Sequence, residues 1–365
     1  MPPGEEFVAA LDQAWRAGAA VLPMDPTAPA PARDRLLEVL RPDLGVADGV
    51  ALVIATSGST GRPKGVELSH EALDASAQAT MARIGRADGD RWLACLPWHH
   101  IGGLQVLLRA RMDRTPLVIH ERFDVERFKA ESDVTLVSLV PTQLVRLLDA
   151  GADLSRFRAI LLGGAMAPRS LLERARSAGA NVVTTYGMSE TSGGCVYDGV
   201  PLDGVRVRVG ADGRILLSGP ILMDGYRLDP DLTADVLSDG WFATSDVAAL
   251  DVDGRLEVRG RIDDVVITGG ENVLSTEVSA VLAGHPGVAD VLVTGVDDAH
   301  WGQRLVAVVV PRGEAPTLEA LRDWCRERLP AAAAPRQLVL VGELPRLPSG
   351  KPDRLAVQSL AATGG

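Results

Sequence analysis

Short runs of aliphatic and β-branched residues alternate with amphipathic stretches through the first half of the chain. The run at 134–139 precedes an amphipathic stretch at 143–149, and the run at 159–162 precedes one at 168–177. Strands that alternate with helices in this way predict βαβ units and a largely parallel sheet. The chain is therefore expected to be an α/β protein, and its 365 residues allow about two or three domains.

The pattern changes near Gly204. Short β-type runs follow, and two of them come directly after the pairs Asp212–Gly213 and Asp253–Gly254. Such pairs are typical of tight hairpin turns, so a small antiparallel β subdomain is expected. From about Asp263 the pattern is that of a small α+β unit. The expected domains are residues 1–262 and residues 263–365.

Composition and charge exclude several classes of protein. The net charge of −11 argues against nucleic acid or a membrane surface as the main partner. No apolar stretch approaches the ~18 residues that span a bilayer, and no export signal is expected at the N-terminus. Three cysteines without metal-type spacing predict reduced thiols in a cytoplasmic protein. The sequence leaves open whether the protein forms a homo-oligomer.

Lysine is rare in this chain. Among 37 lysine and arginine residues, the only lysines are Lys64, Lys129 and Lys351. Where arginine is otherwise used, a retained lysine is a candidate for a position that needs a compact, flexible ammonium group. Lys129 lies in an amphipathic stretch and is expected on a solvated helix face. Lys64 and Lys351 lie in segments rich in glycine, serine and proline, and are the lysines with candidate chemical roles.

The segment 56–65, Thr-Ser-Gly-Ser-Thr-Gly-Arg-Pro-Lys-Gly, is the densest motif. Its glycines allow the backbone N–H groups to turn toward an anion, and its hydroxyls add donors. The segment follows a predicted strand and leads to a predicted helix at 71–84, an arrangement typical of a phosphate cradle. The spacing of a Walker loop is absent; the alternative is a flexible surface loop. The expected phosphate-binding residues are Thr56, Ser57, Gly58, Ser59, Thr60, Gly61 and Lys64.

This segment resembles the phosphate loop of the adenylate-forming superfamily, which includes acyl-CoA synthetases, adenylation domains of nonribosomal peptide synthetases and luciferases. Further segments are similar to the family's motifs, in the family's order: 163–165, 185–191, 241–246, 260–264 and 347–352. The resemblance implies a large N-terminal domain with mostly parallel sheets and an antiparallel subdomain, followed by a small mobile α+β domain. It also implies that the protein uses ATP, Mg²⁺ and coenzyme A.

The resemblance assigns the nucleotide to several loops. Tyr186 is expected to stack on adenine, Asp246 to accept both ribose hydroxyls, and Arg261 to contact ribose and phosphate. Ser245 stands where the family usually has glycine, which is a mild departure. The other expected cofactor-binding residues are Gly163, Gly164, Ala165, Gly187, Gly269 and Gly270.

The residue types suit the chemistry that the resemblance implies. The substrate carboxylate and the α-phosphate are both anions and must approach each other while pyrophosphate leaves. Glu190 and Thr56 are expected to hold Mg²⁺, which together with Lys64 neutralises the leaving group. Lys351 is expected to bridge the carboxylate and the α-phosphate as a point charge.

The resemblance also implies that the C-terminal domain moves. It is expected to rotate about Asp263 after adenylation, to withdraw Lys351, and to bring the loop at 269–272 to the thiol entrance. One site would thus perform adenylation and thioester formation in turn.

Two regions bear on the acid substrate. The segment 96–103 has no acidic residue where family members that activate amino acids carry an aspartate. His100 aligns with the family's histidine between the acyl and thiol pockets; a purely structural histidine is the alternative. The segments 138–148 and 190–199 resemble the o-succinylbenzoate–CoA ligase branch, which acts in menaquinone biosynthesis. The expected substrate-lining residues are His100, Thr142, Gln143 and Ser192.

Three alternatives stay open at this stage. A CoA ligase for another aryl or acyl acid would have the same fold and sites. A stand-alone adenylation enzyme would load a carrier protein instead of coenzyme A. A non-catalytic nucleotide-binding protein is disfavoured, because it would not need both Lys64 and Lys351. The segment before Thr56 is shorter than is usual in the family, so a reduced N-terminal subdomain is expected.

Overall fold

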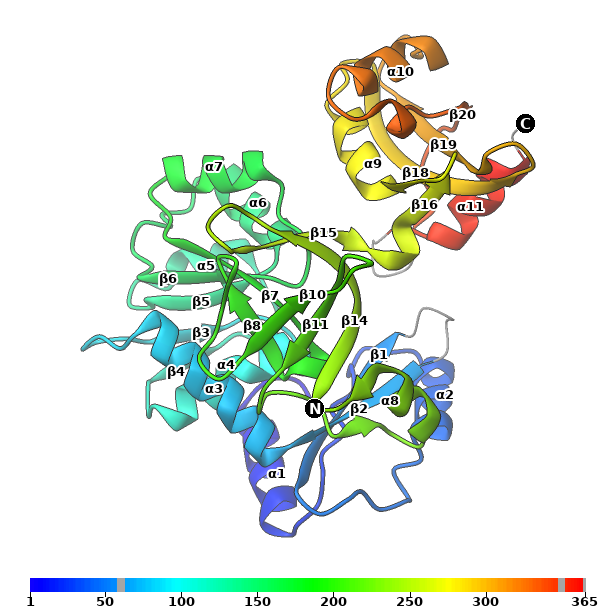
Figure 1. Cartoon of the computed structure of the whole chain (residues 1–365). Coiled ribbons are helices and arrows are strands. Elements are labelled where there is room, and N and C mark those ends of the chain that lie inside the picture. Colours follow the sequence, from blue (N-terminus) through cyan, green and yellow to red (C-terminus); the bar gives the residue numbers. More distant parts are fainter. Residues whose placement is uncertain (58–62, 347–351, 364–365) are drawn as a thin grey trace. The chain divides into compact units, whose positions relative to one another are not determined.

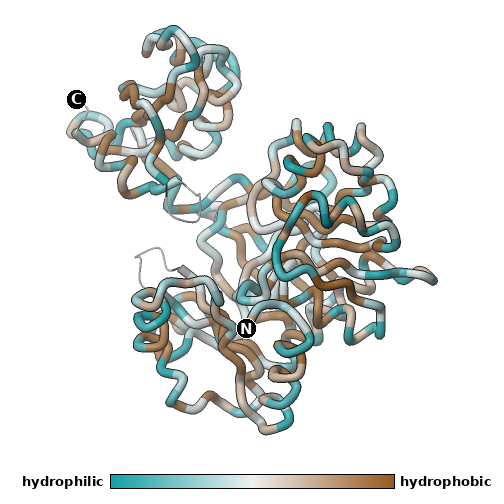
Figure 2. Tube along the Cα trace, turned by 180° about the vertical axis from the view of Figure 1, so that it is seen from behind, coloured by the Kyte–Doolittle hydropathy of each residue, from teal (hydrophilic) through white to brown (hydrophobic). Residues whose placement is uncertain are grey.

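The computed structural model describes residues 1–57, 63–346 and 352–363, which fall into two units (Figure 1). The first comprises Met1–Arg208, Leu216–Ala243 and Val252–Leu256; the second comprises Val209–Ile215, Thr244–Asp251 and the chain from Glu257. In each unit hydrophobic residues concentrate in interior segments, whereas many loops are hydrophilic (Figure 2). Among the described residues, no helix is long and apolar enough to cross a membrane.

A seven-stranded sheet organises the first unit, in the order β4-β3-β5-β6-β7-β8-β9. Strands β4 to β7 along this order are parallel, and β8 and β9 are antiparallel additions at one side. The strands are β3 (Trp92–Ala94), β4 (Leu117–Ile119), β5 (Leu136–Leu139), β6 (Ala159–Leu162), β7 (Val182–Met188), β8 (Gly193–Tyr197) and β9 (Val200–Pro201). The predicted α/β class with a mostly parallel sheet is confirmed.

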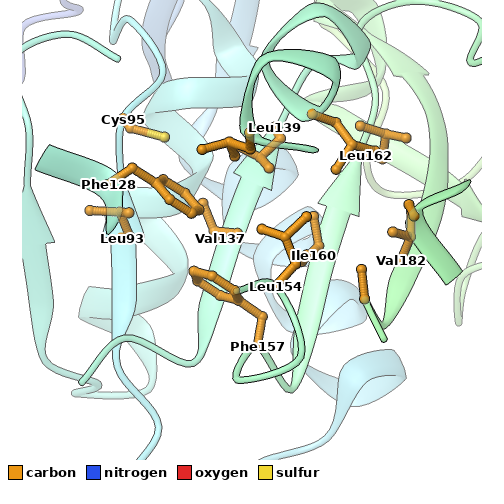
Figure 3. Packing of buried hydrophobic residues seen from close by; sticks show 14 of the residues in the cluster. Leu93, Cys95, Phe128, Val137, Leu139, Leu154, Phe157, Ile160, Leu162 and Val182 are labelled. Carbon is orange, nitrogen blue, oxygen red and sulfur yellow. The ribbon is translucent and has the colours of Figure 1, made fainter. Parts of the chain in front are cut away.

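Helices contact this sheet from both faces. The helices are α3 (His70–Ile84), α4 (Ile101–Met112), α5 (Val125–Ala130), α6 (Pro141–Asp149) and α7 (Arg169–Ser177). On one face Val137, Leu139 and Ile160 pack with residues of α5, α6 and α7 (Figure 3). The rings of Phe128 and Phe157 lie 5.3 Å apart between centroids in this core. Strands β5 and β6 are buried along their whole length, which explains their continuous apolar runs.

The predicted helix at 71–84 is confirmed as α3, but the glycine-rich segment does not lead directly into it, so this part of the prediction is wrong. Strand β1 (Val50–Ser57) pairs antiparallel with β2 (Pro63–Ser69), and α3 begins only at His70. From Val66 onward strand β2 alternates buried and less buried positions, with Val66 and Leu68 fully buried, a period of two that suits a strand. The segment therefore connects the two strands of a hairpin instead of preceding a helix N-terminus.

Two helices that the sequence analysis did not assign precede this hairpin. They are α1 (Glu5–Arg16) and α2 (Ala30–Leu40). The indole N–H of Trp15 donates to the carbonyl of Ala51 at 3.0 Å, and Val21 bridges to Leu52. Both contacts attach the N-terminal segment to β1.

The predicted β subdomain is present after residue 204. Its sheet has the order β10-β11-β14-β13, with β15 beside β14. The strands are β10 (Arg206–Val209), β11 (Arg214–Ser218), β13 (Leu237–Ser238), β14 (Trp241–Leu250) and β15 (Leu256–Arg261). Gly213 and Gly254 have φ values of +80° and +76°, as the two predicted Asp-Gly turns require. Helix α8 (Pro230–Val236) follows the short strand β12 (Gly225–Tyr226), which pairs with β2.

The C-terminal part is the predicted α+β unit. Its sheet has the order β17-β16-β19-β18, and β20 lies parallel to β19. The elements are β16 (Val265–Thr268), β17 (Glu271–Leu274), α9 (Ser275–Ala283), β18 (Val288–Asp298), β19 (Gly302–Pro311), α10 (Leu318–Arg326), β20 (Gln337–Leu340) and α11 (Arg354–Thr363). Alternate residues of β19 enter two cores: Leu305 and Val309 pack with α9 and α10, and Val308 packs with α11.

Candidate active site

The ends of the phosphate segment are held by strand pairing. Thr56 lies opposite Lys64 in the β1–β2 hairpin, and Ser57 lies opposite Pro63. The predicted residues Gly58, Ser59, Thr60 and Gly61 lie outside the described residues. The hairpin therefore places the hydroxyl-bearing Thr56 and the ammonium-bearing Lys64 side by side at the base of the segment.

Tyr226 connects Lys64 to Glu190. The Lys64 Nζ lies 5.0 Å from the centroid of the Tyr226 ring, and the Tyr226 hydroxyl donates to Glu190 Oε1 at 2.8 Å. Burial raises the pKa of the Tyr226 phenol far above its usual value, and the nearby Glu190 carboxylate raises it further. The hydroxyl therefore keeps its proton at neutral pH and donates a hydrogen bond to Glu190.

Glu190 lies in a short 3₁₀ helix, η1 (Ser189–Thr191), between β7 and β8. Its carbonyl accepts from the N–H of Met223 at 2.9 Å. Two hydrogen bonds stabilise the turn that follows: the Ser192 carbonyl accepts from Gln105 Nε2 at 2.7 Å and from Ser76 Oγ at 3.0 Å. Ser192 has a φ of +52°, and these buried hydrogen bonds support that strained conformation.

The predicted adenine residues lie on adjacent strand ends. Gly163 follows β6, and a Cβ there would overlap Thr185 Oγ1, which donates to the carbonyl of Leu162 at 3.2 Å. Gly164 has a φ of +77°, and both Gly164 and Ala165 are exposed. The close approach of Gly163 to Thr185 brings the 163–165 loop beside the strand that carries Tyr186.

Gly187 has a separate structural reason to be glycine. It follows Tyr186 on β7 and lies opposite Gly194 of β8. A Cβ at Gly187 would overlap the backbone carbonyl of Gly193. The glycine therefore allows β7 and β8 to pair closely next to Glu190.

The four predicted acid-site residues lie in different environments. His100 is exposed at the start of α4, with its ring centroid 4.4 Å from that of His99. Gln143 Oε1 accepts from the N–H of Val140 at 3.1 Å and so caps α6. Thr142 is exposed and lines an open hollow of about 440 Å³ between α6 and α7. Ser192 is fully buried, and of these four residues only Thr142 lines that hollow.

In the second unit the predicted ribose and hinge residues lie together. Arg261 Nη1 lies 3.7 Å from Asp246 Oδ1, and Arg261 Nη2 lies 3.2 Å from Asp263 Oδ2. Asp263 belongs to a second 3₁₀ helix, η2 (Ile262–Asp264). Arg354, the first residue of α11, forms an ion pair with Asp264 of the same 3₁₀ helix.

Gly269 and Gly270 form the two-residue turn between β16 and β17. Their φ values are +62° and +84°, and two positive φ values suit the tight turn of such a hairpin. The Gly269 N–H donates to the carbonyl of Trp301 at 2.9 Å. Lys351 lies outside the described residues; Arg346 and Pro352, on either side of it, are joined by a β-bridge.

The donor set fits Mg²⁺. The Glu190 carboxylate and the Thr56 hydroxyl offer hard oxygen ligands, which Mg²⁺ prefers. Within the described residues no group of three or more histidine, cysteine, aspartate or glutamate side chains could hold a metal ion. Mg²⁺ is commonly held through one or two carboxylates together with substrate phosphates, so a lone Glu190 is sufficient.

Tyr226 is not among the site residues predicted from the sequence. A usable signal was present, because the chain has only three tyrosines. Tyr186 falls in a recognised motif, and Tyr197 on β8 pairs with Thr185. As with lysine, the rarity of tyrosine makes each occurrence a candidate for a specific hydroxyl.

Comparison with known proteins identifies the class. The pattern of the family described as AMP-binding enzyme matches residues 41–227, and that of the AMP-binding enzyme C-terminal domain matches residues 277–351. The chain belongs to the AMP-binding enzyme family.

Among named relatives, the chain is 46% identical to a probable 2-succinylbenzoate–CoA ligase of Mycobacterium tuberculosis, over 89% of this chain and 88% of that protein. It is also similar to o-succinylbenzoate CoA synthetase (MenE) of Bacillus subtilis. The structure of that enzyme with the acyl-adenylate OSB-AMP gives a TM-score of 0.80 at 30% identity, covering 96% of this chain and 80% of that one. Its complex with ATP and magnesium ion gives 0.78 at 30% identity, covering 95% and 80%.

Proposed function

We propose that this protein activates o-succinylbenzoate with ATP and transfers the acyl group to coenzyme A, as a step of menaquinone biosynthesis. The linked array of Lys64, Tyr226 and Glu190 beside the phosphate segment supports the reaction class. The choice of acid rests on the relatives, which are named for this acid and cover most of the chain.

In the first half-reaction a carboxylate oxygen of the acid attacks the α-phosphorus of ATP. The bond to pyrophosphate breaks, and the products are acyl-adenylate and pyrophosphate. Glu190 and Thr56 would hold Mg²⁺, which supplies charge neutralisation on the departing phosphates. Lys64 adds a cation at the same end, and Lys351 bridges the reacting carboxylate and phosphate oxygens.

In the second half-reaction the sulfur of coenzyme A attacks the acyl carbonyl. The mixed-anhydride C–O bond breaks, AMP leaves, and the thiol proton passes to solvent. In this proposal residues 263–365 move as a domain about Asp263, and the turn at Gly269 and Gly270 forms the thiol entrance. Residues 1–262 remain as the ATP- and acid-binding domain.

The proposed contacts follow the motifs. Tyr186 stacks on adenine beside the 163–165 loop and Gly187, while Asp246 and Arg261 hold the ribose. The ion pair between Asp246 and Arg261 supports a shared ribose role, because it orients the carboxylate. The proposed acid-site residues are His100, Thr142, Gln143 and Ser192.

We place the reaction in the cytoplasm. The three cysteines are free and buried, and burial raises the pKa of the Cys95 and Cys195 thiols to about 12. Such thiols are inert, in keeping with a reducing compartment. A homo-oligomer is compatible with this chemistry, and light scattering coupled to size-exclusion chromatography tests it.

The reaction is tested by mass spectrometry of the protein incubated with o-succinylbenzoate, ATP, Mg²⁺ and coenzyme A. We expect o-succinylbenzoyl-CoA together with AMP and pyrophosphate. AMP formation only with other acids, such as benzoate or medium-chain fatty acids, would contradict the substrate and leave the reaction class standing. Acyl transfer only to a carrier protein would contradict the acceptor.

Replacement of Lys351 by alanine is expected to abolish adenylation while ATP binding persists, because the ammonium acts on the reacting groups. Isotope exchange between pyrophosphate and ATP measures adenylation, and calorimetry measures ATP binding. Lys129→Ala is the matched control: this lysine is paired with Glu126 at 3.4 Å on an exposed face of α5, and it should behave as the wild type. Adenylation by Lys351→Ala at the wild-type rate would disprove the role of Lys351.

A further inference from the structure

Tyr226 lies between the two charged residues that we expect to meet the phosphates of ATP. Its hydroxyl bonds Glu190 Oε1 at 2.8 Å, and its ring lies 5.0 Å from Lys64 Nζ. Its side chain belongs to the buried core, with 8% of the residue exposed. We propose that Tyr226 is a positioning residue that holds the Glu190 carboxylate and the Lys64 ammonium in place for Mg²⁺ and the departing phosphates. This inference rests on the proposed function.

The backbone around Tyr226 is fixed at several points. Strand β12 pairs with β2 through Tyr226 and Val66, two residues beyond Lys64. The Tyr226 N–H donates to Thr233 Oγ1 at 2.8 Å, and the preceding Met223 N–H donates to the carbonyl of Glu190 at 2.9 Å. The segment thus bonds both to the strand that carries Lys64 and to the turn that carries Glu190. The Tyr226 ring therefore has little freedom to move relative to Lys64 or Glu190.

The hydroxyl and the ring act on different partners. A carboxylate offers about four lone-pair sites, so one bond from Tyr226 orients Glu190 and leaves capacity for a metal ion. Lysine has a long stem with several rotatable bonds, and the face of an aromatic ring attracts its ammonium group. Pre-orientation lowers the entropy lost when the ligand binds. The hydrogen bond to Glu190 and the ring contact with Lys64 should therefore each raise the affinity for ATP with Mg²⁺, while the binding of the adenosine part stays unchanged.

This separation allows two substitutions with different consequences. Tyr226→Phe keeps the ring and removes the hydroxyl, so it should affect the metal more than the lysine. Tyr226→Leu removes both the hydroxyl and the aromatic face. The matched control is Tyr197→Phe, because Tyr197 is 2% exposed and its hydroxyl lies 3.0 Å from Thr80 Oγ1. The control loses a buried tyrosine hydroxyl of the same kind with no bond to Glu190.

The experiment measures binding of ATP by calorimetry as a function of Mg²⁺ concentration, with no acid present, and binding of AMP in parallel. In Tyr226→Phe we expect the Mg²⁺ concentration for half-maximal ATP binding to rise about tenfold, as for loss of one hydrogen bond to a charged group. AMP affinity should stay within about twofold, since AMP lacks the two outer phosphates. Tyr226→Leu should lose further ATP affinity, and Tyr197→Phe should match the wild type in both titrations.

A double substitution tests whether Tyr226 acts through Glu190. If it does, Glu190→Gln combined with Tyr226→Phe should show the same Mg²⁺ dependence as Glu190→Gln alone. A wild-type Mg²⁺ dependence in Tyr226→Phe, or additive effects in the double variant, would overturn the inference. If the wild-type protein binds no ATP in the presence of Mg²⁺, the proposed function fails first and the inference falls with it.

Discussion

The carboxylate of a single residue, Asp90, joins several segments of the first unit. It accepts from Arg158 Nε at 2.9 Å and Nη2 at 2.7 Å, from Thr135 Oγ1 at 3.0 Å, and from the N–H of Ala87 at 2.9 Å. Arg158 also donates to the carbonyl of Ile84 at 2.6 Å, at the end of α3. Burial raises the pKa of Asp90, but the bonds from Arg158, Ala87 and Thr135 outweigh burial and hold the pKa below its usual value.

Stability should consequently depend on pH through Asp90. A carboxyl whose pKa is lower in the folded than in the unfolded state stabilises the fold fully above its unfolded pKa of about 3.9 and loses this effect as the pH falls through the folded value. At pH 7, Asp90→Asn is expected to lower the free energy of unfolding by about 2–4 kcal/mol. Below about pH 4 the gap to the wild type should shrink.

Urea unfolding at neutral and acidic pH measures this gap for Asp90→Asn. Asp153→Asn is the control, because Asp153 is exposed and, within the described part of the chain, bonds only its near neighbour Ser155; its effect should be much smaller. A gap for Asp90→Asn that is the same at both pH values would contradict the assigned role of the carboxylate.

Among helices and strands, the end of α2 is attached to β2 by Arg227. Its guanidinium donates to Glu67 Oε1 at 2.9 Å, and its side chain is 3% exposed. Helix α2 ends at Leu40 and is followed by Arg41 in a left-handed conformation, so the last carbonyls lack partners within the helix. The same guanidinium satisfies carbonyls of this turn, those of Leu40, Arg41, Leu44 and Gly45.

Substitution of Arg227 should therefore destabilise the first unit. Arg227→Met leaves Glu67 and several carbonyls unsatisfied, and we expect a loss of about 3–5 kcal/mol in the free energy of unfolding. Arg227→Lys should lose most of this amount, because one ammonium cannot reproduce the planar set of donors.

Urea unfolding measures the free energy of unfolding of both variants, provided that its dependence on urea concentration has the same slope as in the wild type. The control is Arg169→Lys, since the Arg169 side chain is 93% exposed and, among the described residues, forms an ion pair only with Glu173; a surface pair of this kind contributes little. If Arg227→Lys were as stable as the wild type, the charge alone, and not the geometry of the guanidinium, would be responsible.

For the molecule as a whole, the proposed mechanism requires the C-terminal part to move between the two half-reactions. That part has its own cores on both faces of β19. Arg354 of α11 pairs with Asp264, so the helix that follows Lys351 is attached next to the proposed hinge. The ion pair of Asp263 with Arg261 lies at the same point of the chain.

Asp263→Pro is expected to separate the half-reactions. Proline holds φ near −65°, which a 3₁₀ helix accepts, and prevents rotation about that bond. Thioester formation should slow at least about tenfold relative to adenylation if both depend on rotation at this residue. Pyrophosphate exchange follows the first step and mass spectrometry follows the second. Asp263→Ala also removes the bond to Arg261, so it is the control and should leave the ratio of the two rates unchanged; an equal fall of both rates in the proline variant would argue against the hinge.

Much of the architecture could be predicted from patterns in short segments of the sequence. Periodicity or turn chemistry within a few residues predicts three kinds of feature: the apolar runs of β5 and β6, the amphipathic stretches of α6 and α7, and the Asp-Gly turns before β11 and β15. The resemblance to adenylate-forming enzymes was likewise readable, and family comparison confirms it. The individual site residues stay predictions, and Lys351 and residues 58–61 lie outside the described part of the chain.

The α/β class, the family and the order of the motifs follow from the sequence alone, because each depends on residue types and their spacing within short segments. Which distant groups come into contact depends instead on the folding of the whole chain. Residues Pro63–Ser69 form a strand because β1 offers them a pairing partner, which local propensity cannot reveal. The fold also brings Tyr226 to Glu190, 36 residues away in the sequence. Such contacts depend on how strands align across the fold, and no local pattern encodes that alignment.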